Sequence, residues 1–162
     1  MGIDPGLANT GYGVVEEEGK RVRTLGYGGI QTSPGALLSE RLDKIFTEME
    51  ELLRAYAPQA VAVEQLFFSA NVRSAMNVGE ARGVIILASQ RAGVEIGEYT
   101  PLQVKQAMVG NGRATKDQVK YMVQAMLSIK EKLPSSHAAD ALALALCHLQ
   151  YSGLKKIIDG AT

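Results

Sequence analysis

Apolar and polar residues alternate with a period of two near the amino terminus, and further along the apolar residues recur every three or four positions. The first pattern is typical of half-buried strands, and the second of helices packed on a core. The resulting prediction is a strand ending at Gly2-Ile3, strands over residues 10–17 and 20–32 joined by a tight turn at Glu18-Gly19, and a helix over 36–56.

The rest of the chain alternates short apolar runs with helical patterns. The predicted elements are strands over residues 60–68 and 94–99 and helices over 71–92, 101–109, 115–127 and 135–150. Because no repeat or linker separates them, we expect one α/β domain over residues 1–152, with helices on both faces of a mixed sheet, and a frayed tail over 153–162.

Composition excludes several classes of protein. The single cysteine, Cys147, rules out an internal disulfide and a Cys-based zinc site, and its apolar neighbours predict that it packs as a small hydrophobic residue. No apolar run reaches the roughly 18 residues that a membrane span needs. The start MGIDPG lacks the basic and apolar segments of a signal peptide. We therefore expect a cytoplasmic protein with no membrane partner.

Charge is unevenly distributed although the net charge is zero. Residues 1–64 hold ten Asp and Glu against six Lys and Arg, whereas residues 65–130 hold four against eight. The second region therefore favours a basic face suited to an anionic partner, and ordinary solvated helices are the alternative explanation.

Three acidic residues stand where the pattern predicts burial. Asp4 follows a strand directly, Glu64 interrupts the run AVAVEQLFF, and Asp140 interrupts an Ala/Leu helix. Each has a separate structural explanation, namely a turn residue for Asp4, an exposed strand end for Glu64 and the wet edge or positive N-terminus of a helix for Asp140. A shared explanation is that the three carboxylates converge on divalent metal, because a buried carboxylate needs a partner.

Carboxylate oxygens suit Mg²⁺ or Mn²⁺, and a pair of such ions is suited to phosphodiester hydrolysis. His137 lies three residues before Asp140 and therefore on the same helical face. It either completes the ligand set, where its nitrogen would favour Mn²⁺, or orients the attacking water; a purely structural histidine is the alternative.

At these residues the chain resembles a known family. The segments GIDPGLANTGYGVV, AVEQLFFSANVRSAMNVGEARGV, YTPLQVKQAMVGNGRATKDQV and HAADALALALCH are similar, in order, to the RuvC-type Holliday-junction resolvases of bacteria. The resemblance implies a ribonuclease H-like fold with a five-stranded mixed sheet. It also implies a homodimer that makes two symmetrical, Mg²⁺- or Mn²⁺-dependent nicks across a four-way DNA junction during recombination and repair, leaving 5′-phosphate ends, in association with a branch-migration motor complex.

By the same resemblance, Asp4, Glu64 and Asp140 fall on catalytic acids, and His137 falls on a fourth metal-site position that is an acid in some members. The residues expected to contact DNA are Phe67, by stacking on an opened base, with Arg73, Lys105, Arg113 and Lys116. Small residues at every fourth position of the helix over 71–92 (Ala75, Gly79, Gly83) permit close approach to the sheet or to a second subunit, and the resemblance favours the subunit.

Two other functions compete with this prediction. A phosphotransferase of related fold also begins with a strand and an Asp-Gly-type turn, but it needs two such domains around a nucleotide, and 162 residues provide one. A non-catalytic junction-binding module is the second alternative, although carboxylates are poorly suited to binding phosphate.

Overall fold

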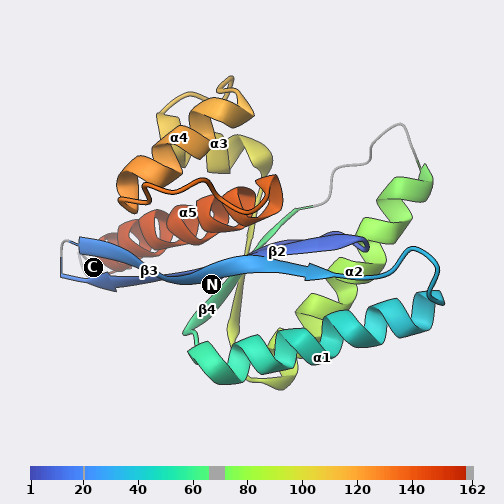
Figure 1. The fold of residues 1–162 in the computed structure, drawn as a ribbon. Helices are drawn as coiled ribbons and strands as arrows, with labels where there is room; N and C mark the ends of the chain where they lie inside the picture. Colours follow the sequence, from blue (N-terminus) through green and yellow to red (C-terminus); the bar gives the residue numbers. More distant parts are fainter. Residues whose placement is uncertain (20, 66–71, 160–162) are drawn as a thin grey trace.

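The computed structural model describes residues 1–19, 21–65 and 72–159, which form one sheet with helices on both faces (Figure 1). The elements are β1 (Gly2–Asp4), β2 (Asn9–Glu18), β3 (Arg21–Gln31), α1 (Leu38–Tyr56), β4 (Ala60–Glu64), α2 (Val72–Arg91), β5 (Glu95–Tyr99), α3 (Pro101–Val109), α4 (Lys116–Met126) and α5 (Ser136–Asp159).

The sheet has the strand order β3-β2-β1-β4-β5, and it is mixed as predicted. The three amino-terminal strands are antiparallel neighbours, whereas β4 runs parallel to both β1 and β5. The antiparallel part follows from the two short connections of the hairpins. The parallel part follows from the crossovers through α1 and α2, because parallel neighbours need a long connection, usually a helix.

Two hydrophobic clusters fill the space between the sheet and its helices. On one face α5 lies against the sheet with α3 and α4 outside it, and on the other face α1 and α2 pack together (Figure 1). Cys147 is fully buried in the first cluster, as predicted for a small hydrophobic residue. The two clusters make β1 and β4 a buried central layer in which exposure rises only at the strand ends, whereas the edge strand β3 stays partly exposed along its length.

The register of the parallel strands brings two of the unusual acids to the same edge of the sheet. Gly2 pairs with Ala62 and Ile3 with Val63. The next position along each strand is Asp4 on β1 and Glu64 on β4. Both acids therefore stand at the carboxyl ends of neighbouring parallel strands, which is where open α/β sheets hold their functional sites.

Helix α5 approaches the sheet through its backbone. A Cβ atom added to Gly2 would overlap the carbonyl oxygen of Ala141, and one added to Gly11 would overlap the carbonyl oxygen of His137. At Gly13 an added Cβ would lie 2.7 Å from a side-chain carbon of Leu142. Glycine inside a strand marks this kind of close approach. These glycines let α5 lie directly on β1 and β2.

Several boundaries differ from the prediction. Strand β4 ends at Glu64, and residues 66–68 of the predicted strand lie outside the described residues. Helix α5 continues to Asp159, well past the predicted end at residue 150 and into the segment expected to be a frayed tail. Gly153 is the local signal for an end near Ser152, but residues 151–159 contain no proline, and a single glycine costs a helix only about 1 kcal/mol.

The predicted capping box is confirmed. Thr115 accepts a hydrogen bond from the backbone N–H of Gln118 at 3.2 Å, and the Gln118 side chain accepts one from the backbone N–H of Thr115 at 2.8 Å. This reciprocal pair begins α4 at Lys116, which therefore projects from the first turn of a well-capped helix.

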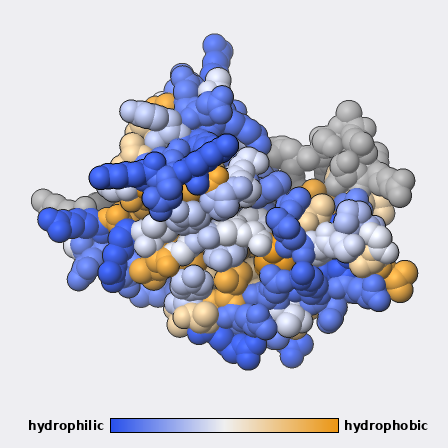
Figure 2. Space-filling model, viewed as in Figure 1, coloured by the Kyte–Doolittle hydropathy of each residue, from blue (hydrophilic) through white to orange (hydrophobic). Residues whose placement is uncertain are grey.

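The surface agrees with the composition. The face seen in Figure 2 is mostly hydrophilic, and hydrophobic residues appear on it in scattered groups. Among the described residues, no helix combines the length and the apolar character that crossing a membrane would require.

Candidate active site

Asp4 is the most enclosed of the unusual acids. It ends β1, its side chain is 14% exposed, and a hydrogen bond of 2.7 Å joins its Oδ2 to Nδ1 of His137. Burial raises the pKa of Asp4 above its ordinary value, and the negative charge of Asp140 adds to this effect, while the His137 hydrogen bond opposes it. Asp4 is therefore a carboxylate whose charge is only partly compensated by the protein.

Glu64 shares this environment. Its pKa is raised to about 7, first by burial and then by the charges of Asp4 and Asp140, and only Lys116 acts in the opposite direction. Asp4 and Glu64 follow the paired positions of neighbouring strands, His137 in the first turn of α5 bonds to Asp4, and Asp140 lies on the same face of that helix. The structure thus brings Asp4, Glu64 and Asp140 to one edge of the sheet, although 136 positions separate the first from the last.

Asp140 lies at the more open side of this group. Its side chain is one-third exposed, and its Oδ2 lies 3.5 Å from Nζ of Lys116. Lys116 is largely exposed, so this ion pair is weak, and its ammonium remains accessible to another anion. Within the part of the chain that the structure describes, Lys116 is thus a cation beside the acids on the solvent side.

His137 and Asp140 lie in the first turn of α5. Backbone contacts with β1 and β2 fix the position of this turn relative to Asp4. Gly11 of β2 lies against the backbone of His137, and Gly2 of β1 lies against that of Ala141. Sequence analysis did not identify these glycines as part of the site. For Gly11 the available signal is its alternation with Gly13 in TGYG, which puts two glycines on one face of a strand; Gly2 carries no comparable signal.

The group fits a divalent metal by the chemistry of its donors. Three carboxylates supply hard oxygen ligands, and burial together with the neighbouring acids raises the pKa of both Asp4 and Glu64, an effect that a bound cation would offset. Within the described residues, however, no three His, Cys, Asp or Glu side chains are already drawn together as a ligand set. The carboxylates repel one another, so a bound cation would be needed to bring them closer.

The residues expected to contact DNA lie in different parts of the structure. Lys116 lies beside Asp140. Lys105 is half-buried on α3. Arg113 is exposed in the loop before α4, and its backbone N–H donates a hydrogen bond to Asn111 Oδ1 at 2.9 Å. Phe67 lies outside the described residues. Arg73 lies in the first turn of α2, and only its backbone is described.

The small-residue stripe on α2 does not face the sheet at its best-described position. Gly83 is exposed, and an added Cβ would meet nothing within 4 Å. The core-facing side of the helix is instead formed by Ala81, Ile85 and Ala88, which are fully buried. Of the two possibilities for this stripe, close approach to the sheet is therefore excluded at Gly83.

Comparison with known proteins agrees with this geometry. Residues 1–148 match the family described as crossover junction endodeoxyribonuclease RuvC. The crossover junction endodeoxyribonuclease RuvC of Rubrobacter xylanophilus is 53% identical over 91% of this chain and 83% of its own length. That of Brevibacillus brevis is 48% identical over 99% of this chain and 96% of its own length.

A solved structure extends the likeness to the fold. Thermus thermophilus RuvC in complex with a Holliday junction substrate superposes with a TM-score of 0.90 at 42% identity, over 95% of this chain and 94% of that one. This match confirms the expected ribonuclease H-like fold. The family resemblance seen in the sequence is therefore confirmed over nearly its whole length, and the chain belongs to the crossover junction endodeoxyribonuclease RuvC family.

Proposed function

We propose that this protein is a structure-selective endonuclease that resolves four-way DNA junctions by paired, symmetrical nicks with 5′-phosphate ends. Two findings support the proposal, namely its family membership and the likeness to a relative whose structure contains a Holliday junction substrate. The observation that carries it is the meeting of Asp4, Glu64, His137 and Asp140 at one edge of the sheet.

The three carboxylates would hold divalent metal, which the family requires, and we propose two Mg²⁺ or Mn²⁺ ions in each site. When bound, such ions activate a water molecule and stabilise the leaving 3′-oxygen. His137 orients Asp4 through Nδ1, which leaves its Nε2 available to a metal or to the attacking water. Asp140 completes the oxygen donors from the side nearest to solvent.

Positive side chains around this edge would bind the DNA backbone. Lys116 is the best placed, because it is exposed and stands beside the acids. A phosphate drawn to its ammonium would lie next to the carboxylates. We propose that Lys105, Arg113 and Arg73 contact neighbouring phosphates, and that Phe67 stacks on a base opened at the junction centre.

We further propose a homodimer formed through α2, because two sites related by a two-fold axis match paired cuts in a junction. Exposed apolar residues on this helix support the assignment. Met76 and Leu87 are 61% and 52% exposed, and Gly83 lies between them in sequence. Association with a branch-migration motor complex is proposed from the family resemblance alone.

The test is a nicking assay on a synthetic four-way junction and on a linear duplex of the same sequence, with Mg²⁺ or Mn²⁺. Wild-type protein should nick only the junction, and a chelator should abolish the activity. Asp4→Asn keeps the size of the side chain but removes its charge, so it should reduce nicking by at least about 1,000-fold while still binding the junction.

The alternatives give different results in the same assay. A non-catalytic junction-binding module would bind the junction and leave it intact with every metal. Equal nicking by wild type and Asp4→Asn would remove Asp4 from the mechanism. Nicking of the linear duplex at the same rate would contradict selectivity for four-way junctions.

A further inference from the structure

We propose that Arg82 is a positioning residue for Glu64, holding the end of β4 in the place where the Glu64 carboxylate can share a metal with Asp4 and Asp140. The inference rests on the proposed function, because it concerns the same site. It adds a residue from α2, an element that otherwise contributes only proposed DNA contacts and the proposed dimer interface.

The contacts of Arg82 join three elements next to Glu64. Its Nε donates to the backbone carbonyl oxygen of Glu64 at 3.2 Å, and its Nη2 donates to Oε2 of Glu98 on β5 at 2.5 Å. The peptide that follows Glu64 is held separately, since the backbone N–H of Gln65 donates to the carbonyl of Tyr99 at 2.8 Å. Both polar groups of this peptide therefore have a fixed partner.

The position explains why a charged side chain is used here. A carbonyl at the end of a strand has left the regular ladder and needs another donor. The Arg82 side chain is 18% exposed, so its part-buried bond to the Glu64 carbonyl faces less competition from water than its bond to Glu98, which is 43% exposed. Arg23, which pairs with Glu16, is 63% exposed. Hydrogen bonds from an enclosed guanidinium are among the stronger ones in proteins.

The anchor is needed because Glu64 stands among like charges. Asp4 and Asp140 disfavour the ionised form of Glu64, and the same repulsion pushes its carboxylate away from the group. Holding the backbone at the strand end limits that displacement. Arg82 acts on the backbone of Glu64 and not on its carboxylate, so it positions this residue without competing with a metal for its oxygens.

The chemistry of the guanidinium separates positioning from simple charge. Arg presents a planar fork that reaches Glu64 and Glu98 at once, whereas a Lys at the same place has the charge but a single nitrogen. If Arg82 acts by position, Arg82→Lys should resemble the neutral Arg82→Gln. If only its charge matters, Arg82→Lys should behave as wild type.

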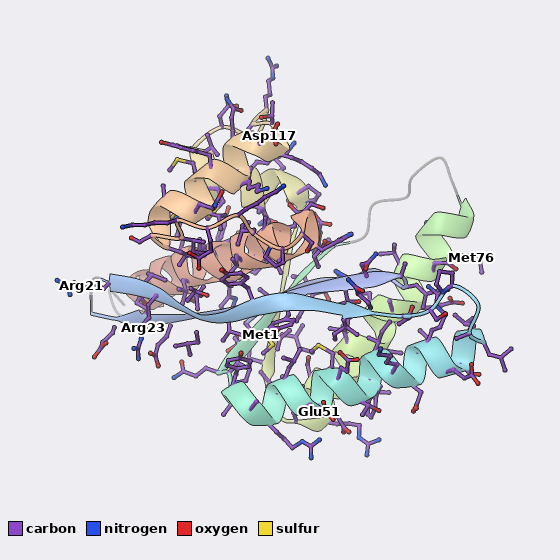
Figure 3. All side chains as sticks on the ribbon, in the orientation of Figure 1. Met1, Arg21, Arg23, Glu51, Met76 and Asp117 are labelled. Atoms are coloured by element: carbon purple, nitrogen blue, oxygen red, sulfur yellow. The ribbon has the colours of Figure 1, made fainter. Side chains whose placement is uncertain are left out.

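The experiment measures Mn²⁺ binding by calorimetry without DNA, together with the Mn²⁺ concentration that gives half-maximal nicking of a four-way junction. Arg82→Gln should weaken Mn²⁺ binding by about tenfold and raise the half-maximal concentration to match, as for other residues that orient metal ligands. Junction binding in a chelator should remain at the wild-type level. Arg23→Gln removes a comparable but exposed ion pair remote from α2 (Figure 3) and should change neither metal measurement.

The possible failures can be told apart. Wild-type Mn²⁺ binding by Arg82→Gln, or by Arg82→Lys, would overturn the positioning role, whether or not the junction is cut. A wild-type protein that binds Mn²⁺ but cuts no junction would contradict the proposed function instead. If Arg82→Gln does not fold, Arg82→Lys and Glu98→Gln decide, since both disturb the fork and each should weaken Mn²⁺ binding by at least about threefold.

Discussion

The two faces of the sheet are packed in different ways. On the α5 face, Gly2 and Gly11 bring the backbone of the strands against the backbone of the helix, with no room for a methyl group. On the opposite face, α1 and α2 pack through large side chains such as Ile45, Met49 and Ile85, which are fully buried. Side chains of this kind can adjust their rotamers, whereas two backbones in contact cannot.

The difference in packing between the two faces matches the location of the site residues, which come from the strand ends and from α5. Helix α5 provides His137 and Asp140, and its close contact with the strands sets their position relative to Asp4. Among the described side chains, α1 contributes no site residue, and α2 contacts the backbone of Glu64 through the long side chain of Arg82. The face that needs accurate placement is therefore the one where, beside its buried side chains, strand and helix backbones also touch directly at Gly2 and Gly11.

The largest expected effect comes from adding a methyl group to the backbone contact. Gly11→Ala would place a Cβ atom against the carbonyl of His137 and push the first turn of α5 away from Asp4. We expect nicking to fall by about 100-fold, because a displacement near 1 Å has effects of this size. The rate of junction nicking and the thermal unfolding midpoint measure the outcome.

Gly29→Ala is the matched control, because Gly29 pairs with Gly11 across the β2–β3 ladder. Its Cβ atom would be in ordinary van der Waals contact, 3.5 Å from the carbonyl oxygen of Thr10. Nicking by Gly29→Ala should remain near the wild-type rate. Equal losses in both variants would show that the contact of Gly11 with His137 is not what positions the site.

The second prediction concerns the face packed by side chains. Ile45→Ala removes a fully buried side chain from the core-facing side of α1 and should lower the free energy of unfolding by about 2–5 kcal/mol. Nicking at a temperature well below unfolding should stay within about twofold of wild type, since α1 holds no site residue and the core can partly relax. Denaturant unfolding and nicking assays test the two parts.

Leu38→Ala on the exposed start of α1 is the control for burial, and it should destabilise the protein far less than Ile45→Ala. A large loss of nicking in Ile45→Ala, with the protein still folded, would show that both faces place the site with equal accuracy. The contrast between backbone and side-chain packing would then fail.

The third prediction concerns the ionisation of Glu64, at the edge of the sheet where the three acids lie. Because the pKa of Glu64 is raised to about 7, the folded protein binds more protons than the unfolded chain between its ordinary value near 4.5 and about 7. Without metal, stability should therefore fall as the pH rises through this window and stay lower above it. The contribution of Glu64 is on the order of 1 kcal/mol, reduced by its partial exposure to solvent.

Denaturant unfolding in a chelator at several pH values measures this fall. Glu64→Gln carries no charge at any of these pH values and should be less sensitive to pH than wild type. Glu51→Gln, on the exposed side of α1, should keep the wild-type dependence (Figure 3). An identical pH dependence in Glu64→Gln and wild type would show that the three carboxylates are not coupled.

The smallest expected effect belongs to a single side-chain bond on the α5 face. The Tyr99 hydroxyl and Nδ1 of His148 are hydrogen-bonded at 2.8 Å, which joins β5 to α5 far along the helix from the acids. Tyr99→Phe should cost about 0.5–1 kcal/mol of stability and leave nicking unchanged, because the glycine contacts already place the first turn. Tyr121→Phe, at an exposed tyrosine, is the control.

Much of the fold and part of the site could be predicted from the local pattern. The elements, the mixed sheet and the capping box at Thr115 follow from periodicity and from short-range hydrogen bonding, which act within a few residues. The acids stood out because a carboxylate in an apolar run is costly wherever the chain places it. The end of α5 was missed because Gly153 is a local stop signal, and the helix continues through it to Asp159.

Only the tertiary structure decided how these parts meet. The parallel register of β1 and β4 sets Asp4 beside Glu64, and the fit of α5 onto glycines brings His137 within hydrogen-bonding distance of Asp4. The proposed positioning role of Arg82 depends on the tertiary contacts of α2 with Glu64 of β4 and Glu98 of β5. The sequence by itself determined which residues are chemically unusual, since that depends on near neighbours. Their distances depend on contacts between residues far apart in the sequence, from 18 positions for Arg82 and Glu64 to 133 for Asp4 and His137, which no local pattern encodes.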